Sequence, residues 1–203
     1  MPTDSADPEQ KIIDAIYRGA CDPAELATAI ELIAQYFDVS GASLGELDPA
    51  APEAQFVIGA RTFDPAFLAD YQPYAELDPA PQAFSALALG TVSTTDRMFS
   101  QDFLRTNVFL NEFLRPHGID ATLGGPLISA GGRFAIFGLL QGKKRKRFDA
   151  DDIARLERLT PHLTRALQIR RLFLQSEARR STLEAVVDRS QAPITILYWH
   201  EGE

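Results

Sequence analysis

The sequence contains a single cysteine and only three histidines among its 203 residues. One thiol, Cys21, cannot form an internal disulfide bond or build a cysteine-based metal site, and we expect it to pack between two helices. The histidines, at positions 117, 162 and 200, lie far apart and outside any metal-ligand or nucleophile motif. The sequence therefore predicts no catalytic residue, no metal ion and no cofactor, and we expect that the chain is not an enzyme.

Long apolar runs are scarce as well. No stretch of about 18 apolar residues occurs, so the sequence predicts no membrane-spanning helix. The first seven residues, MPTDSAD, are polar and acidic, which is the opposite of a secretory signal peptide. We therefore expect a cytoplasmic protein that does not contact a membrane.

Positive charge is rare over most of the chain. Residues 1–142 carry 7 Lys and Arg against 19 Asp and Glu, whereas residues 143–203 carry 13 against 9, and the net charge is −8. The acidic majority repels nucleic acid, so we expect DNA contact only through a domain that this sequence does not contain. The basic run KKRKR at 143–147 would suit nucleic acid or an acidic partner surface, but its place between a strand and a helix favours a solvated loop.

Asp-Pro pairs are frequent and mark the starts of helices. An aspartate cap followed by proline favours helix initiation, and three of the five pairs precede apolar residues at helical spacing. The helices predicted in this way begin at Pro8, Pro23 and Pro65. Residues 99–114 predict a further, aromatic helical stretch, and Asp149 caps a long final helix. Pro161 lies inside that helix and predicts a kink or a restart there.

Strands are predicted in five short segments: 42–47, 55–60, 91–95, 121–129 and 133–141. Gly131 and Gly132 join the last two through a tight turn, which favours an antiparallel hairpin. Pro79 and Pro81 predict extended backbone over residues 78–82. The order of the elements predicts an α+β fold, in which an antiparallel sheet is covered by helices and followed by a long C-terminal helix. An apolar stretch at 194–199 predicts a last strand, which we interpret as the start of a truncated segment.

Aromatic residues are plentiful, with 13 phenylalanines in the chain. Many lie between positions 71 and 113, where they either fill a core or line a small-molecule pocket with one or two polar anchors. Asp78 is the candidate anchor, because a carboxylate among apolar residues can accept a ligand N–H; the alternative is a helix cap or turn. The candidate ligand-binding residues are Tyr71, Tyr74, Asp78, Phe103, Phe109 and Phe113.

Several segments together resemble a known family. They are FLNEFLRPHG at 109–118, LGG at 123–125, FDADD at 148–152 and LTPHL at 159–163. These segments resemble LuxR-type helix-turn-helix transcription regulators, in particular a proteobacterial subgroup with a GAF/PAS-like N-terminal sensor. The resemblance extends from Ile12 to Leu174, and the NEFLRP part of the first segment is its most specific piece.

The segment YQPYAELDP at 71–79 resembles the tyrosine-rich segment of autoinducer-binding domains. That resemblance implies that Asp78 contacts the amide of an acyl-homoserine lactone, with Tyr71 or Tyr74 on the pocket wall. The tryptophan of the binding motif has no counterpart, because the single tryptophan of this chain is Trp199. We therefore leave the effector open as a small apolar molecule.

The resemblance also implies a domain organisation and a homodimer. We expect a GAF/PAS-like sensor domain at 1–170, a linker and dimerisation helix at 171–190, and the start of a truncated segment at 191–203. The predicted dimer contacts are Leu163, Leu167 and Leu174. The expected function is the sensory, ligand-binding and dimerisation region of a bacterial transcription regulator, which controls a C-terminal helix-turn-helix outside this sequence. The alternative is a ligand-free dimerisation or protein-interaction scaffold.

Overall fold

Aspartate caps begin the first helices, as the sequence predicts. The structure is a computed structural model that describes residues 7–51, 55–143 and 146–189. In it, side-chain oxygens of Asp7, Asp22 and Asp64 accept hydrogen bonds from backbone N–H groups at 3.1, 2.9 and 2.8 Å. Each cap satisfies a donor that the first turn leaves free. The helices that follow are α1 (Pro8–Arg18), α2 (Pro23–Tyr36) and α3 (Pro65–Tyr71).

The described strands form one antiparallel sheet in the order β2-β1-β5-β4-β3. Their bounds are β1 (Gly41–Leu47), β2 (Phe56–Arg61), β3 (Ser93–Thr94), β4 (Ile119–Ala130) and β5 (Arg133–Gly142). The predicted hairpin between β4 and β5 is confirmed, and Gly131 and Gly132 turn it with φ values of 62° and 82°. Such positive φ values favour glycine because it has no Cβ.

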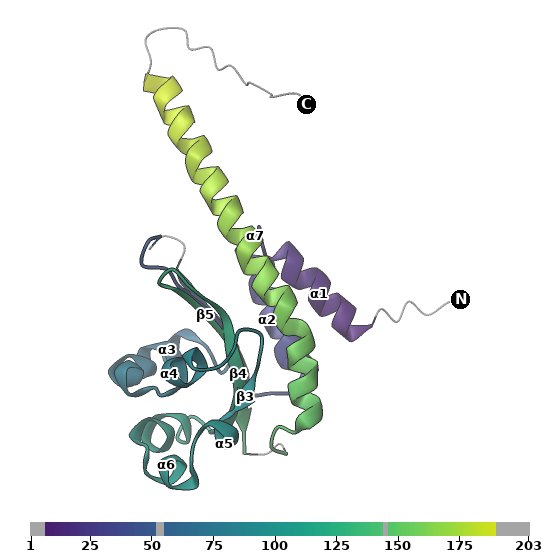
Figure 1. The fold of residues 1–203 in the computed structure, drawn as a ribbon, viewed down its shortest axis with the longest axis vertical. Helices are drawn as coiled ribbons and strands as arrows, with labels where there is room; N and C mark the ends of the chain where they lie inside the picture. The colour runs from purple at the N-terminus through teal and green to yellow at the C-terminus, as the bar shows by residue number, and fades with distance from the viewer. Residues whose placement is uncertain (1–6, 52–54, 144–145, 190–203) are drawn as a thin grey trace, which may run out of the picture.

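Helices cover both faces of this sheet (Figure 1). On one face lie α1, α2 and α7 (Ala150–Arg189), and on the other lie α3 and the short helices that follow it. Those short helices are η2 (Gln72–Leu77), α4 (Ala80–Ser85), α5 (Thr95–Met98), α6 (Gln101–Thr106) and η3 (Phe109–Leu114). The predicted α+β fold is confirmed.

Strand alternation divides the apolar residues between two cores. On β1 and β5, Leu44, Phe137 and Leu139 face α1, α2 and α7 in the larger core, where they are at most 2% exposed. Leu140, one residue further along, instead belongs to the smaller aromatic core beneath η3. Because successive side chains of a strand point to opposite faces, one sheet supports both cores.

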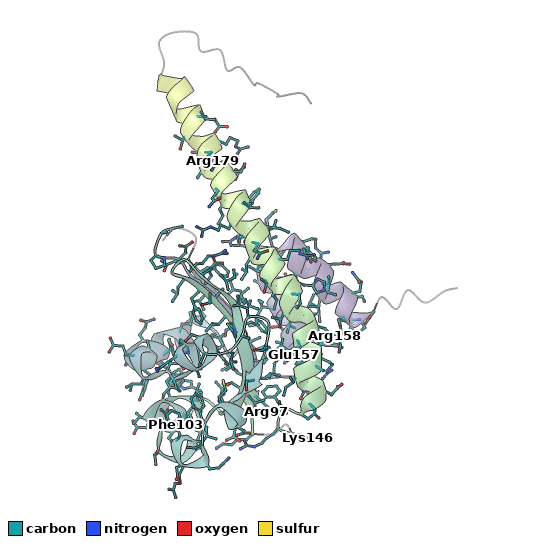
Figure 2. All side chains as sticks on the ribbon, viewed as in Figure 1. Arg97, Phe103, Lys146, Glu157, Arg158 and Arg179 are labelled. Carbon is teal, nitrogen blue, oxygen red and sulfur yellow. The ribbon has the colours of Figure 1, made fainter. Side chains whose placement is uncertain are left out.

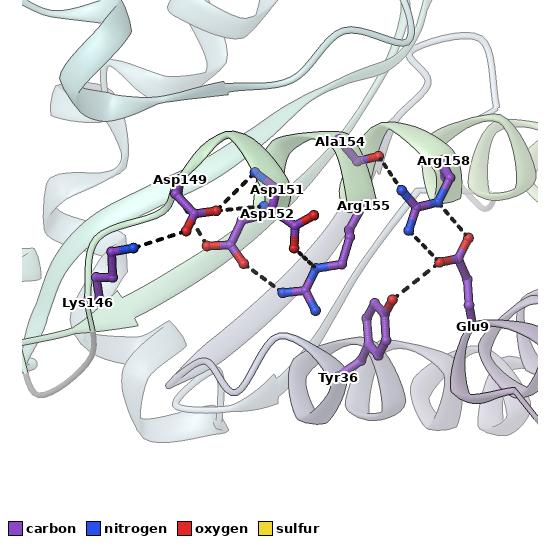
Figure 3. Close-up of polar contacts among 9 residues, drawn as sticks. All are labelled: Glu9, Tyr36, Lys146, Asp149, Asp151, Asp152, Ala154, Arg155 and Arg158. Atoms are coloured by element: carbon purple, nitrogen blue, oxygen red, sulfur yellow. Dashed lines mark hydrogen bonds and ion pairs between the residues drawn. The ribbon is translucent and has the colours of Figure 1, made fainter. Parts of the chain in front are cut away.

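The long helix α7 begins in a reciprocal cap (Figure 3). The Asp152 backbone N–H donates to Asp149 Oδ1 at 3.1 Å, and the Asp149 N–H donates to Asp152 Oδ2 at 3.2 Å. Further along the helix, Arg158 binds Glu9 of α1 at 2.8 Å, and the Tyr36 hydroxyl of α2 donates to Glu9 at 3.2 Å. The N-terminal half of α7 is therefore bonded to α1, and it also contacts α2, because the Arg155 guanidinium lies 5.0 Å from the centre of the Tyr36 ring.

Pro161 does not end α7, which runs without interruption from Ala150 to Arg189. The prediction of a restart at this proline is wrong. Proline removes one backbone hydrogen bond and its ring crowds the carbonyl four residues earlier. Leu159 and Leu163 on either side are nevertheless buried in the larger core, and this packing holds the helix together. Beyond the sheet, the C-terminal half of α7 projects away from the rest of the domain, where Arg179 is labelled in Figure 2.

Buried ion pairs connect the sheet to α7. Glu46 of β1 is 3% exposed and pairs with Arg133 of β5 at 2.5 Å, and Arg133 also donates to the Leu167 carbonyl of α7 at 3.2 Å. Asp48, which is 1% exposed, pairs with Arg171 on the next turn of the helix. These contacts therefore link β1 and β5 mechanically to α7.

The segment before the aromatic helices differs from its prediction. Residues 80–82, expected to be extended, lie in α4, because Pro81 occupies the first turn, where its missing N–H costs nothing. The strand predicted at 91–95 shrinks to β3, since α5 begins at Thr95. The stretch at 99–114 is helical but breaks at Asn107 into α6 and η3.

Three other predictions concern Cys21, membrane-spanning helices and the C-terminal segment. Cys21, expected to be packed, is exposed. Within residues 7–51, 55–143 and 146–189, no helix is both long and apolar enough to span a membrane. The strand predicted at 194–199 lies outside the described residues, as does the 191–203 segment.

Candidate ligand-binding site

A cavity of about 100 Å³ lies between the sheet and the aromatic helices. Its lining is predominantly apolar, and it comes from β1, β4 and β5 on one side and from α3, α4 and η3 on the other. The lining residues are Ser43, Phe63, Phe67, Tyr71, Asp78, Ala80, Phe84, Phe109, Phe113, Leu114, Thr122, Ile136, Gly138 and Leu140. For comparison, an engineered apolar cavity of about 150 Å³ holds benzene.

Phe113 is the centre of the aromatic wall. Its ring lies 5.0 Å from Phe67, 5.3 Å from Phe109 and 5.7 Å from Tyr71, measured between centroids. Residues 109–114 form a π-helical turn, in which Phe109 and Phe113 stack at an interplanar angle of 28° and both line the cavity. Isolated π-helical turns are rare and frequently occur at functional sites.

Asp78 is the one ionisable carboxyl group in this lining. Its Oδ2 accepts a hydrogen bond from the Tyr71 hydroxyl at 3.1 Å, and its Oδ1 accepts one from the Ala80 N–H at 2.8 Å. Burial raises the pKa of Asp78, and burial beside the Asp78 carboxylate raises the pKa of the Tyr71 hydroxyl. The Asp78 side chain therefore accepts from the first backbone N–H of α4, as a turn aspartate does, and it also lines the cavity.

Two further polar side chains, Ser43 and Thr122, line the cavity from the sheet. Ser43 of β1 lies opposite Gly138 of β5 in the register of the two strands. An added Cβ at Gly138 would meet only the Ser43 Oγ, at 3.7 Å. The absence of a side chain at Gly138 therefore leaves part of the cavity open.

The structure brings together four of the six predicted ligand-binding residues, namely Tyr71, Asp78, Phe109 and Phe113. Tyr74 packs behind the wall, with its ring 5.3 Å from that of Phe113. Phe103 lies on α6 and stacks on Phe99 at 4.6 Å, outside the cavity (Figure 2). Sequence reasoning missed the sheet residues of the lining, although strand alternation carries the signal that could have placed them.

The predicted dimer contacts do not share one surface. Leu163 and Leu167 are each 1% exposed and belong to the larger core, so they are not available to a partner in this fold. Leu174 is half-buried. The apolar residues that α7 does expose nearby are Ile169, Leu172 and Phe173, at 38%, 67% and 39%.

The two histidines that the structure describes have partners within the chain, as does Arg147 of the basic run. His162 shares a hydrogen bond with the Tyr17 hydroxyl at 3.0 Å, and His117 lies 2.8 Å from the Phe113 carbonyl oxygen. In the basic run, Arg147 pairs with Asp96 and Asp120, whereas positions 144–145 lie outside the described residues. In the part of the chain that the structure describes, no three His, Cys, Asp or Glu side chains cluster in a way that could hold a metal ion.

The sequence matches no protein-family model and no curated protein. Solved structures with the same fold are nevertheless found. The ligand-binding domain of VqsR from Pseudomonas aeruginosa superposes with a TM-score of 0.59 and 18% identity, covering 81% of this chain and 96% of that one. The N-acylhomoserine lactone-dependent LuxR-family transcription factor CepR2 from Burkholderia cenocepacia gives 0.57 and 14%, with coverage of 79% and 91%.

The fold is also shared outside those regulators. The phycoerythrobilin-bound GAF domain of a cyanobacterial phytochrome superposes with a TM-score of 0.54 and 9% identity, covering 81% of this chain and 96% of that domain. At these identities the comparisons establish the fold. The chain therefore has the GAF-like fold of the ligand-binding domains of LuxR-type regulators.

Proposed function

We propose that this chain is the sensory region of a LuxR-type transcription regulator and that it binds a small, mostly apolar effector in the aromatic cavity. The observation that carries the proposal is the position of Asp78, a partly buried carboxyl group in a predominantly apolar wall. Concave apolar sites with a few convergent polar groups are the usual form of small-molecule sites. The fold shared with ligand-binding domains of such regulators supports the same function.

The effector has two chemical requirements. It needs a compact apolar body, because the cavity of about 100 Å³ is close in size to one that holds a single aromatic ring. It also needs an N–H or O–H group, because each Asp78 oxygen uses one lone pair within the protein and keeps another for a ligand. A long acyl chain would have to displace the η3 wall, so a compact molecule fits this chain better.

The proposed response travels from the cavity to α7 through the sheet. β1 carries Ser43 in the cavity lining and Glu46 on the opposite face, and Glu46 pairs with the Arg133 that also binds the Leu167 carbonyl. A ligand that favours one arrangement of these strands would shift the position of α7. In a regulator of this type, a helix-turn-helix attached through α7 would read that shift.

We further propose that a second copy of the chain covers the exposed side of α7. Ile169, Leu172 and Phe173 follow the i, i+3, i+4 spacing of one helix face and are exposed beyond the end of the core. Exposed apolar residues that cluster in this way mark interaction sites on soluble proteins. The proposed domain organisation accordingly keeps a sensor up to residue 170 and a dimerisation helix after it.

Thermal unfolding with a compound panel tests the ligand-binding proposal. The panel should contain small phenols, other single-ring compounds and N-acyl-homoserine lactones of different chain length. A compound present at about 100 times its Kd is expected to raise the melting temperature on the order of 5–10 °C, because it binds only the folded chain. If no compound shifts the transition, the ligand-free scaffold becomes the better account of the cavity.

A further inference from the structure

Thr122 places an unusual hydroxyl group in the cavity wall. On β4, Leu123 points into the larger core, so its neighbour Thr122 points to the opposite face and into the cavity lining. The residue is 8% exposed, and its backbone N–H donates to the Thr95 Oγ1 at 3.2 Å. Among the residues that the structure describes, nothing accepts from or donates to the Thr122 hydroxyl itself.

An unpartnered buried hydroxyl group is unfavourable for the folded protein. Buried polar groups in proteins are nearly always hydrogen-bonded, because desolvation without a partner costs free energy. Valine has the same shape and would fill this strand position without that cost. A hydrogen-bond partner for the Thr122 hydroxyl would therefore come from a molecule that enters the cavity.

Thr122 also separates two cavities. Besides the aromatic cavity, it lines a polar cavity of about 70 Å³ enclosed by α5, α6, η3, β4 and Arg147, and Leu114 is the other residue common to both walls. In the polar cavity Arg147 binds both Asp96 and Asp120, and Arg115 donates to the Asn111 side-chain oxygen. A group that reaches this wall from the aromatic cavity would meet the Thr122 hydroxyl, with the polar cavity behind it.

We propose that Thr122 is a second polar anchor of the binding site and that it selects effectors with two polar groups on one compact apolar body. One group is the N–H or O–H that donates to Asp78, and the other is an uncharged hydroxyl or carbonyl group that pairs with the Thr122 hydroxyl. Anionic effectors are excluded, because a carboxylate would face Asp78 in a largely apolar cavity. This inference rests on the proposed ligand-binding function and specifies the ligand class.

The test compares matched probes on the purified chain and on a Thr122→Val variant. The probes are the three methylphenols, which carry one polar group, and the three corresponding hydroxybenzyl alcohols, which carry two. At least one hydroxybenzyl alcohol is expected to bind the wild type more tightly than its matching methylphenol. Thr122→Val should weaken that alcohol about three- to tenfold, the range for one hydrogen bond, and leave the methylphenol unchanged.

The melting temperature of the ligand-free variant distinguishes this role from a structural one. Thr122→Val removes an unpartnered hydroxyl, so the melting temperature is expected to stay the same or rise. The matched control is Thr160→Val on α7, a buried threonine whose hydroxyl donates to the Leu156 carbonyl oxygen at 2.9 Å and which does not line either cavity. The control should leave the affinities of both probe classes unchanged.

Three results would overturn the inference. A lower melting temperature of Thr122→Val, with both probe classes weakened equally, would show that the hydroxyl is structural. Binding of methylphenols without any preference for a hydroxybenzyl alcohol would reject the second anchor and leave the proposed function standing. Failure of every probe to bind the wild type would count against the proposed function itself, and the inference would fall with it.

Discussion

The Tyr71 hydroxyl donates a hydrogen bond to Asp78 Oδ2 across 3.1 Å at the wall of the aromatic cavity. This bond lowers the pKa of Asp78, but desolvation by burial has the larger, opposite effect, so the pKa of Asp78 is raised overall. The tyrosine therefore holds the carboxyl group in place and supports its charged form without fully offsetting burial. A ligand donor that reaches Asp78 would add to this support.

A pH dependence follows for Asp78. The pKa of Asp78 in the folded chain exceeds the ordinary 3.8. Between pH 3.8 and that raised pKa, Asp78 therefore binds more protons in the folded chain than in the unfolded chain. The free energy of unfolding should therefore fall as the pH rises through that window. Asp78→Asn is expected to remove this part of the slope, measured by urea unfolding between acidic and neutral pH. The exposed cap variant Asp22→Asn is the control, and an Asp78→Asn slope equal to that of the wild type would contradict the raised pKa.

The buried pair of Glu46 and Arg133 predicts a non-additive effect on stability. Glu46→Ala leaves the Arg133 guanidinium buried without its carboxylate and should lower the free energy of unfolding by about 3–5 kcal/mol. Arg133→Met in the same chain removes the unpaired charge and should recover a large part of that loss. The measurement is a double-mutant cycle by denaturant unfolding. Additive losses would show that the two side chains do not interact.

An exposed leucine and a buried leucine on α7 are expected to respond differently to replacement by aspartate. Leu172→Asp changes an exposed residue of the proposed dimer contact and should give folded monomers in sedimentation experiments. Leu167→Asp buries a charge in the larger core and should cost more than about 3 kcal/mol of stability, so that the chain unfolds. If Leu172→Asp leaves a dimer intact, this face of α7 is not the contact.

The sequence predicts the frame of this fold well, for clear physical reasons. The Asp-Pro starts at Pro8, Pro23 and Pro65 are local signals, in which a cap and a fixed φ act within a few residues, and all three are confirmed. The hairpin at Gly131 is equally local. Pro81 misled the prediction of extended backbone, because proline is also tolerated in the first turn of a helix.

The site is harder to predict, because its residues meet only in the folded chain. The aromatic residues of the wall stand out in composition, and four of the six predicted residues share the cavity. Ser43, Thr122 and Gly138 do not stand out, since each is a small residue whose role depends on which strand it faces. Leu163 and Leu167 fit a dimer helix equally well by spacing, and only the packing of α7 on the sheet places them in the core.

The central claim, that the aromatic cavity holds a ligand, is tested most directly by filling it. Gly138→Leu places a side chain in the open part of the cavity, whereas Gly45→Leu makes the same change on β1 outside the lining. The measurement is calorimetric titration of both variants and the wild type with the methylphenol that binds best. The account predicts that Gly138→Leu stays folded and loses binding, while Gly45→Leu binds as the wild type does. Undiminished binding to folded Gly138→Leu would contradict the account, because the ligand would then lie elsewhere.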